Sequence, residues 1–156
     1  MEPHLQSRPK KTPLSIDEQE RIRAIAIEKI QALLLPSQGI SKIVLIGSSV
    51  KGVFGSYEAP GFRGSLFSDF DFIVFVKNTY KIPSFLEREL NGKPFEDEGL
   101  NLAYRIKNYV NDTYDAEVFF IRESSLKLES VREFAEQAGI PIDEQSQNPS
   151  ITVYQS

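Results

Sequence analysis

The sequence predicts an α/β (α+β) domain in which a small mixed sheet of three to four strands is flanked by helices. Three apolar runs, at residues 43–46, 69–76 and 116–121, are rich in β-branched and aromatic residues and have the length of buried strands. Segments with helical spacing of apolar residues alternate with these runs. At 156 residues, the chain has the length of one domain with one core.

The composition excludes several kinds of chemistry. The chain has no cysteine, so disulfides, thiolate metal sites and thiol catalysis are ruled out. Its one histidine, His4, lies near the start of the chain, which argues against histidine-based acid–base catalysis. The chain has 18 basic and 22 acidic residues, a net charge of −4, so it lacks the excess of basic residues that nonspecific nucleic-acid binding usually requires. Catalysis would have to rest on carboxylates, hydroxyls, backbone amides or a bound metal.

The first third of the chain predicts an arm, a helix and a strand. Residues 1–14 carry three prolines and no apolar stretch like that of a signal peptide, which predicts a flexible N-terminal arm on a cytoplasmic protein. The sequence contains no run of about 20 apolar residues, so no membrane span is predicted. Ser15 and Glu18 form a capping box that predicts the start of a helix, which Pro36 ends. The strand at 43–46 follows and runs into a Gly47-Ser48 turn.

The middle of the chain predicts a loop, a strand and two helices. Residues 57–66 contain a proline and two glycines without periodicity, which predicts an exposed loop. The strand at 69–76 begins with acidic residues. Capping and spacing then predict helices at 84–90 and 100–110.

The last third predicts a strand, a helix and a tail. A strand at 116–121 is followed by a helix at 126–138, which Gly139 closes. Residues 140–142 suggest a short edge strand, where a proline is tolerated. Residues 145–156 are polar and are expected to be loose. The domain is therefore expected to span residues 15–144.

Three acids stand inside or at the start of apolar strands: Asp69, Asp71 and Glu117. Residues i and i+2 of a strand face the same side, so Asp69 and Asp71 should project together. A hard divalent cation relieves the repulsion between such carboxylates, and Mg²⁺ binds one or two of them together with water and phosphates. The sequence therefore predicts a magnesium site that Glu117 completes from a neighbouring strand.

A glycine-serine turn offers a phosphate cradle. Glycine permits close approach of a phosphate, while the Ser48 hydroxyl and free amides at a helix start supply donors. The Gly-Ser pair occurs three times, at Gly47, Gly55 and Gly64, and the preceding strand selects Gly47-Ser48. Lys51, four residues after Gly47, is a further candidate for contacting phosphates.

Together, these motifs resemble those of the nucleotidyltransferase superfamily that includes DNA polymerase beta, the CCA-adding enzymes and the small single-domain, or minimal, nucleotidyltransferases. The resemblance runs through residues 43–52, 68–74 and Glu117, and extends over about residues 16–144. It implies a nucleotidyltransferase-like fold in which Asp69, Asp71 and Glu117 bind magnesium. It also implies that Gly47, Ser48 and Ser68 contact the nucleotide.

The resemblance implies transfer of a nucleoside monophosphate from a nucleoside triphosphate, such as ATP, to an acceptor hydroxyl. The acceptor, a small molecule or a protein, is not encoded visibly, and a partner subunit or homo-oligomer could contribute to its recognition. An alternative from another class is a binding module on the same fold, such as an antitoxin-like partner of a helical RNase toxin.

The chain departs from the superfamily pattern in two places. Twenty residues separate Ser48 from Asp69, about twice the number usual in small members, so residues 57–66 look inserted. A second alignment through Gly55-Ser56 gives a more usual spacing. The third acid is more often aspartate, which leaves Glu117 as either a metal ligand or a base and Asp115 as an alternative third carboxylate.

Overall fold

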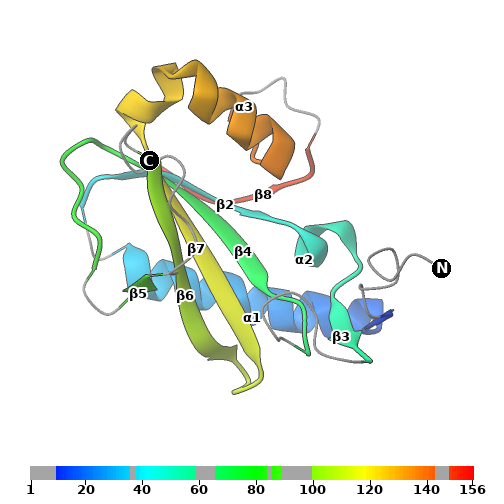
Figure 1. The fold of residues 1–156 in the computed structure, drawn as a ribbon. Helices are drawn as coiled ribbons and strands as arrows, with labels where there is room; N and C mark the ends of the chain where they lie inside the picture. Colours follow the sequence, from blue (N-terminus) through cyan, green and yellow to red (C-terminus); the bar gives the residue numbers. More distant parts are fainter. Residues whose placement is uncertain (1–9, 36–37, 59–65, 84–85, 89–99, 143–147) are drawn as a thin grey trace.

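The computed structural model describes residues 10–35, 38–58, 66–83, 86–88, 100–142 and 148–156. The fold is α+β, with a six-stranded mixed sheet in the order β5-β6-β7-β4-β2-β8 and a separate two-stranded sheet, β1-β3 (Figure 1). Within the larger sheet, β4 and β7 run parallel, and the other neighbouring pairs are antiparallel.

The elements follow one another in this order: β1 (Lys11–Pro13), α1 (Ile16–Leu34), β2 (Ile40–Ile46), α2 (Ser48–Lys51), β3 (Gly55–Tyr57), β4 (Phe70–Val76), β5 (Glu87–Arg88), β6 (Leu100–Val110), β7 (Tyr114–Arg122), the 3-10 helix η4 (Glu123–Lys127), α3 (Glu129–Ala138) and β8 (Ile151–Gln155). None of the helices in the described ranges has the length and apolar character needed to cross a membrane.

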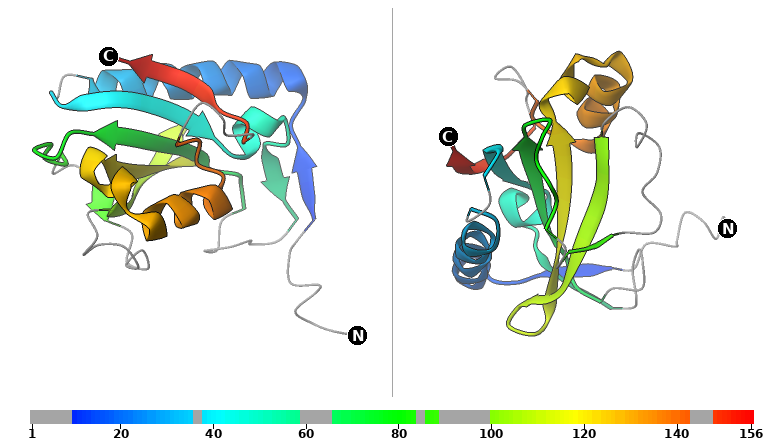
Figure 2. Two further views of the ribbon diagram at one scale, coloured as in Figure 1. Left: turned by 90° about the horizontal axis from the view of Figure 1, so that it is seen from above. Right: turned by 90° about the vertical axis from the view of Figure 1, so that its left-hand side faces the viewer.

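The larger sheet is covered by a helix on each face. Helix α1 lies against one face, and α3 packs on part of the other (Figure 2). Side chains of β4 alternate between the two layers: Phe72 and Val74 pack with α1, whereas Ile73 and Phe75 pack with α3. A strand that is buried on both faces must be apolar along its length, as this one is after its acidic start.

The predicted central elements are confirmed. The runs at 43–46, 69–76 and 116–121 lie within or largely within β2, β4 and β7. Helix α1 begins after Ser15, whose hydroxyl accepts a hydrogen bond from the Glu18 amide at 3.2 Å. Helix α3 ends at Gly139, which adopts a left-handed conformation with φ of 80°.

The helix expected at 100–110 is wrong, because this segment is strand β6. It pairs with β7 through a tight turn in which Asn111 and Asp112 have φ of 53° and 54°. Asn and Asp tolerate this left-handed conformation and favour hairpins. Pairing with β7 therefore overrides the apolar spacing, which a helix could also have used.

The helix expected at 84–90 is also wrong over the described residues 86–88, where β5 pairs with the outer side of β6. An edge strand presents unpaired amides and carbonyls, and this segment satisfies some of them. The rest of the predicted helix lies outside the described residues.

The C-terminal predictions need two corrections. Residues 140–142 form no strand, and the tail expected at 145–156 instead contributes β8 over Ile151–Gln155. Strand β8 pairs with β2 along the outer edge of the sheet, which leaves no room for a second strand there. The expectation of three to four strands is therefore too low, because β6 and β5 extend the sheet on one side and β8 extends it on the other.

The arm expected at 1–14 is ordered at its described end. Strand β1 pairs with β3, and the Leu14 amide donates to the Phe54 carbonyl at 2.8 Å. Of the loop expected at 57–66, Tyr57 belongs to β3 and residues 59–65 lie outside the described residues.

Strand β6 is fastened to α1 by Tyr109. Its buried hydroxyl donates to the backbone carbonyl of Ala26, and burial raises the pKa of the Tyr109 phenol far above its ordinary value. We expect Tyr109→Phe to lower the free energy of unfolding by about 1 kcal/mol, the net value of one such bond.

Urea unfolding measures this loss. Tyr104→Phe, the same chemical change at a half-buried position of the same strand, is the matched control and should cost less than about 0.5 kcal/mol. Equal losses in the two variants would contradict the assigned hydrogen bond.

Candidate functional site

The acids that the sequence singles out lie on, or directly before, two adjacent strands, β4 and β7, and Arg105 of β6 continues their row. Asp71 of β4 pairs in register with Glu117 of β7, and Glu117 pairs in register with Arg105 of β6. Asp69 precedes β4, two residues before Asp71, and Asp115 precedes Glu117 by the same interval. The alternation of strand side chains places these charged residues on one face of the sheet.

Asp69, Asp71 and Glu117 come close enough to share a cation. One carboxylate oxygen from each lies within 4.8 Å of the others, and all three side chains are partly exposed. The sheet face that carries them is the one on which α3 packs further along β4 and β7. Helix α3 packs against Ile73, Phe75 and Ile121, whereas the side chains of Asp69 and Glu117 are each 22% exposed to solvent.

Gly47 forms a wall of the site. A Cβ atom at this position would lie 2.6 Å from Oδ2 of Asp71, closer than two such atoms can approach. Gly47 also has φ of 84° and ψ of −155°, a backbone conformation that is essentially confined to glycine. Glycine is therefore required at position 47 for two reasons: its backbone conformation, and the space that it leaves for the Asp71 carboxylate.

Two side chains of α1 hold the short helix α2 that follows Gly47. Arg23 donates to the Ser49 carbonyl at 3.1 Å. Buried Gln19 donates to the Gly52 carbonyl at 3.1 Å, and its Oε1 accepts from the Phe54 amide at 3.3 Å. These contacts fix both ends of α2, and so the position of Gly47, relative to the sheet.

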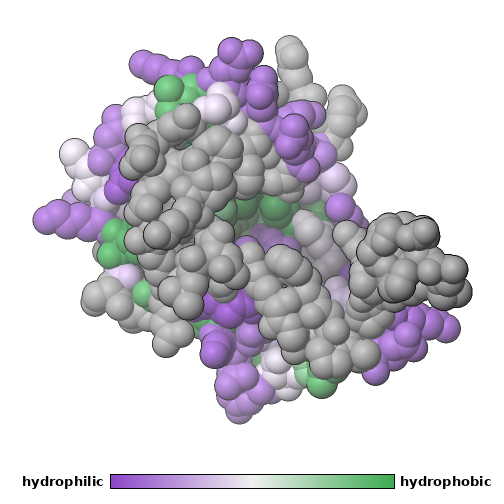
Figure 3. Space-filling view, viewed as in Figure 1, coloured by the Kyte–Doolittle hydropathy of each residue, from purple (hydrophilic) through white to green (hydrophobic). Residues whose placement is uncertain are grey.

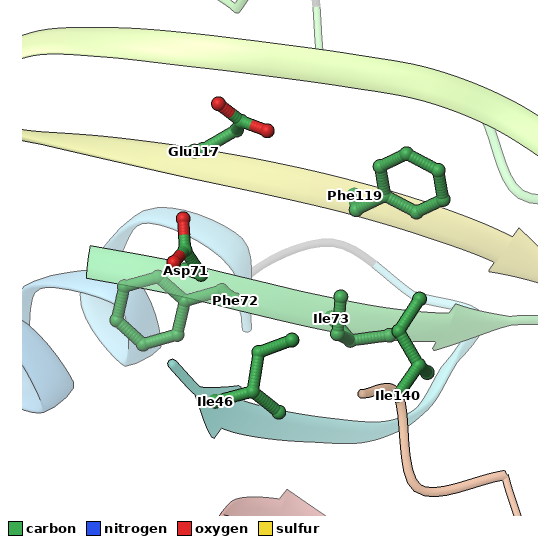
Figure 4. Close-up of a pocket in the computed structure, with 7 residues that line it drawn as sticks. All are labelled: Ile46, Asp71, Phe72, Ile73, Glu117, Phe119 and Ile140. Carbon is green, nitrogen blue, oxygen red and sulfur yellow. The ribbon is translucent and has the colours of Figure 1, made fainter. Parts of the chain in front are cut away.

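A pocket of about 240 Å³ opens beside the acids. In Figure 4 the carboxylates of Asp71 and Glu117 stand at one end of it, while apolar side chains form the other end. The apolar wall consists of Ile46, Ile73, Phe119 and Ile140. Apolar surface is also visible at the floor of a hollow near the centre of this face (Figure 3).

The pocket suits a ligand with two unlike parts. Its acidic end favours a cation or a hydroxyl, whereas its apolar end favours a ring or a hydrocarbon group. Ile140, from the segment expected to form an edge strand, lines the pocket from the position after α3.

Arg105 is the site residue that the sequence analysis missed. Its Nη1 lies 2.9 Å from Asp115, and its Nη2 lies 3.2 Å from Asp69 and 3.4 Å from Glu117. The side chain is only 13% exposed, so these ion pairs are partly shielded from water. The signal that could have revealed it is the Asn111-Asp112 turn, which identifies a hairpin and so puts Arg105 on the strand next to β7. A register shift between Ile106 and Val110 then brings Arg105 opposite Glu117.

Two of the residues expected to contact the nucleotide, Ser68 and Lys51, lie beside β3 and at the end of α2, respectively. The hydroxyl of buried Ser68 accepts the Gly55 amide at 3.1 Å, which gives Ser68 a role in holding β3. Lys51 is exposed at the last position of α2. Ser48, by contrast, is partly buried at the start of α2, directly after Gly47.

The Gly55-Ser56 pair, which gives the second alignment, has a role in pairing two strands. Gly55 and Ser56 lie in β3 and pair with β1. A Cβ atom on Gly55 would lie 2.0 Å from the Thr12 carbonyl oxygen, so glycine is required there for the contact between the two strands. Gly47-Ser48 is the pair that adjoins the acids, and Gly64-Ser65 lies outside the described residues.

The residues present fit a magnesium ion. Three carboxylates supply the hard oxygen ligands that Mg²⁺ prefers, and the space beside Oδ2 of Asp71 is kept open by the missing side chain of Gly47. Asp69 and Asp71 would be the first two ligands, and Glu117 the third.

Comparison with protein-family models and with curated proteins finds no match to this chain.

The role of Gly47 can be tested by substitution. We expect Gly47→Ala to weaken Mg²⁺ binding by about 10- to 100-fold, the usual effect of disturbing a group next to a metal ligand, because the new Cβ displaces the Asp71 carboxylate. It should also lower stability by about 1–3 kcal/mol through backbone strain. Calorimetric titration with MgCl₂ and thermal unfolding measure the two effects.

Gly52→Ala is the control. Gly52 also has a positive φ, of 78°, but nothing lies within 4 Å of the position its Cβ would take. This variant should lose stability and keep its Mg²⁺ affinity. Equal loss of Mg²⁺ affinity in both variants would show that strain in the turn, rather than contact with Asp71, is responsible.

Proposed function

We propose that this protein is a magnesium-dependent nucleotidyltransferase that moves a nucleoside monophosphate from a nucleoside triphosphate to an acceptor hydroxyl. The observation that carries the proposal is the convergence of Asp69, Asp71 and Glu117 within 4.8 Å on an open sheet face, with Gly47 against Asp71. The resemblance of the same motifs to the nucleotidyltransferase superfamily supports it.

The reaction exchanges a phosphoanhydride bond of the triphosphate for a phosphoester bond to the acceptor. The acceptor oxygen forms a bond to the α-phosphorus, the bond from that phosphorus to the bridging oxygen of the β-phosphate breaks, and pyrophosphate leaves. The acceptor hydroxyl loses its proton in the process. A divalent cation bound to the acids would neutralise charge on the triphosphate and favour in-line displacement.

The residues of this chain have separate tasks in this proposal. Asp69 and Asp71 supply the carboxylates that hold the cation, and Glu117 completes the site or takes the proton of the acceptor. Gly47 lets the phosphates approach the backbone, and the Ser48 hydroxyl donates to them. The apolar wall of the pocket, which includes Phe119 and Ile140, packs against a non-phosphate part of the substrates.

A second candidate function is a binding module on the same fold, such as the antitoxin-like partner of a helical toxin. The observation that favours it is the position of Arg105, because its guanidinium offsets part of the negative charge without any cation. Such a module would need the acids for structure rather than for metal binding.

Substitution of Asp71 distinguishes the two functions. We expect Asp71→Asn to remove Mg²⁺-dependent binding of nucleoside triphosphates and to leave thermal stability unchanged or raised, since it neutralises one of several repelling carboxylates without changing shape. The measurement is calorimetric titration with each of the four ribonucleoside triphosphates, with and without Mg²⁺, together with thermal unfolding.

Asp112→Asn is the matched control. Asp112 is exposed in the turn between β6 and β7, where asparagine also tolerates the positive φ, so nucleotide binding should be unchanged. A wild-type protein that gives no Mg²⁺-dependent signal, combined with unfolding of Asp71→Asn, would assign the acids a structural role and favour the binding module.

A further inference from the structure

Arg105 contacts two of the three acids that the proposed function assigns to a cation. Its Nη2 lies between Oδ2 of Asp69, at 3.2 Å, and Oε2 of Glu117, at 3.4 Å. Both acids belong to the trio whose oxygens lie within 4.8 Å of one another. The guanidinium therefore compensates the same carboxylates that the proposed function assigns to Mg²⁺.

We propose that Arg105 and the divalent cation are alternative partners of Asp69 and Glu117, and that Asp115 retains the guanidinium when the cation binds. This inference rests on the cation site of the proposed function. It makes Arg105 a positioning residue that keeps the acids together in the metal-free protein and opposes metal binding.

The distances separate an anchoring contact from two bridging contacts. Nη1 of Arg105 lies 2.9 Å from Oδ2 of Asp115, shorter than either contact of Nη2. The other oxygen of Asp115 accepts the Asn108 amide at 2.9 Å, which fixes this carboxylate to the backbone of β6. The longer contacts to Asp69 and Glu117 are the ones that a competing cation would replace.

Electrostatics explains why the two cations exclude one another. Without a positive charge among them, carboxylates this close repel one another. The guanidinium offsets this repulsion in a site where its side chain is only 13% exposed and screening is reduced. A divalent cation within about 5 Å of the guanidinium would be repelled by it, so each occupant lowers the affinity of the site for the other.

Titration with Mg²⁺ alone, and with Mn²⁺ as a second probe, tests this competition. We expect Arg105→Gln to tighten binding of both cations by about 10- to 100-fold, because the competing charge is removed. Arg105→Lys keeps a positive charge and should stay closer to the wild-type affinity. Lys77→Gln makes the same change of net charge at an exposed position beyond the far end of β4, and should leave the affinity unchanged.

Thermal unfolding with and without Mg²⁺ distinguishes this role from a purely structural one, because a purely structural role predicts a Tm difference between the variant and wild type that does not depend on Mg²⁺. In EDTA, Arg105→Gln should lower the Tm because the acids lose their compensating charge. At saturating Mg²⁺ the difference from wild type should shrink or reverse, because the cation then compensates the acids in both proteins. An equal Tm difference with and without Mg²⁺ would overturn the proposal.

The outcomes also separate this inference from the proposed function. If wild type binds Mg²⁺ and Arg105→Gln binds it equally or more weakly, the competition is refuted and the metal site stands. If neither protein binds Mg²⁺ or Mn²⁺, the proposed function fails, and the competition fails with it. Binding by Arg105→Gln that exceeds binding by wild type supports both.

Discussion

Repulsion among the carboxylates of Asp69, Asp71 and Glu117 is the interaction on which the site depends. Parallel pairing of β4 with β7 puts Asp71 directly beside Glu117, and strand alternation puts Asp69 on the same side. The chain tolerates this arrangement because Arg105 enters the row from β6. The same repulsion favours a divalent cation, so the feature that makes the site costly in the metal-free protein also makes it suited to magnesium.

The rest of the fold supports this row of charges. Helix α1 packs on the opposite face of the sheet and fastens β6 through Tyr109 and α2 through Gln19. Helix α3 seals the far part of the charged face and leaves the acids accessible beside an apolar pocket. The strands that carry the acids, β4 and β7, lie at the centre of the sheet, paired on both sides and packed between α1 and α3, an arrangement that favours a fixed geometry of the carboxylates.

The sequence predicts the parts of the fold that have strong local signals. The apolar run of β4, the Ser15 cap of α1 and the Gly139 end of α3 are each encoded by neighbouring residues, and Asp69 with Asp71 follows from strand alternation. Strand β8 is not, because its pairing partner β2 lies far away in the sequence. Strand β6 is not either, although its partner β7 follows directly, because its apolar spacing also suits a helix. Arg105 was missed for this reason, since its place beside Glu117 depends on β6 being a strand.

The most direct measurement of the central claim is a crystal structure of the protein with Mn²⁺ and a non-hydrolysable nucleoside triphosphate. We expect anomalous density in direct contact with carboxylate oxygens of Asp69 and Asp71, with the phosphates beside Gly47. We also expect that Arg105 contacts Asp115 and has left Asp69 and Glu117. Absence of a metal peak among the acids, with Arg105 still on Asp69 and Glu117 at saturating Mn²⁺, would contradict the account.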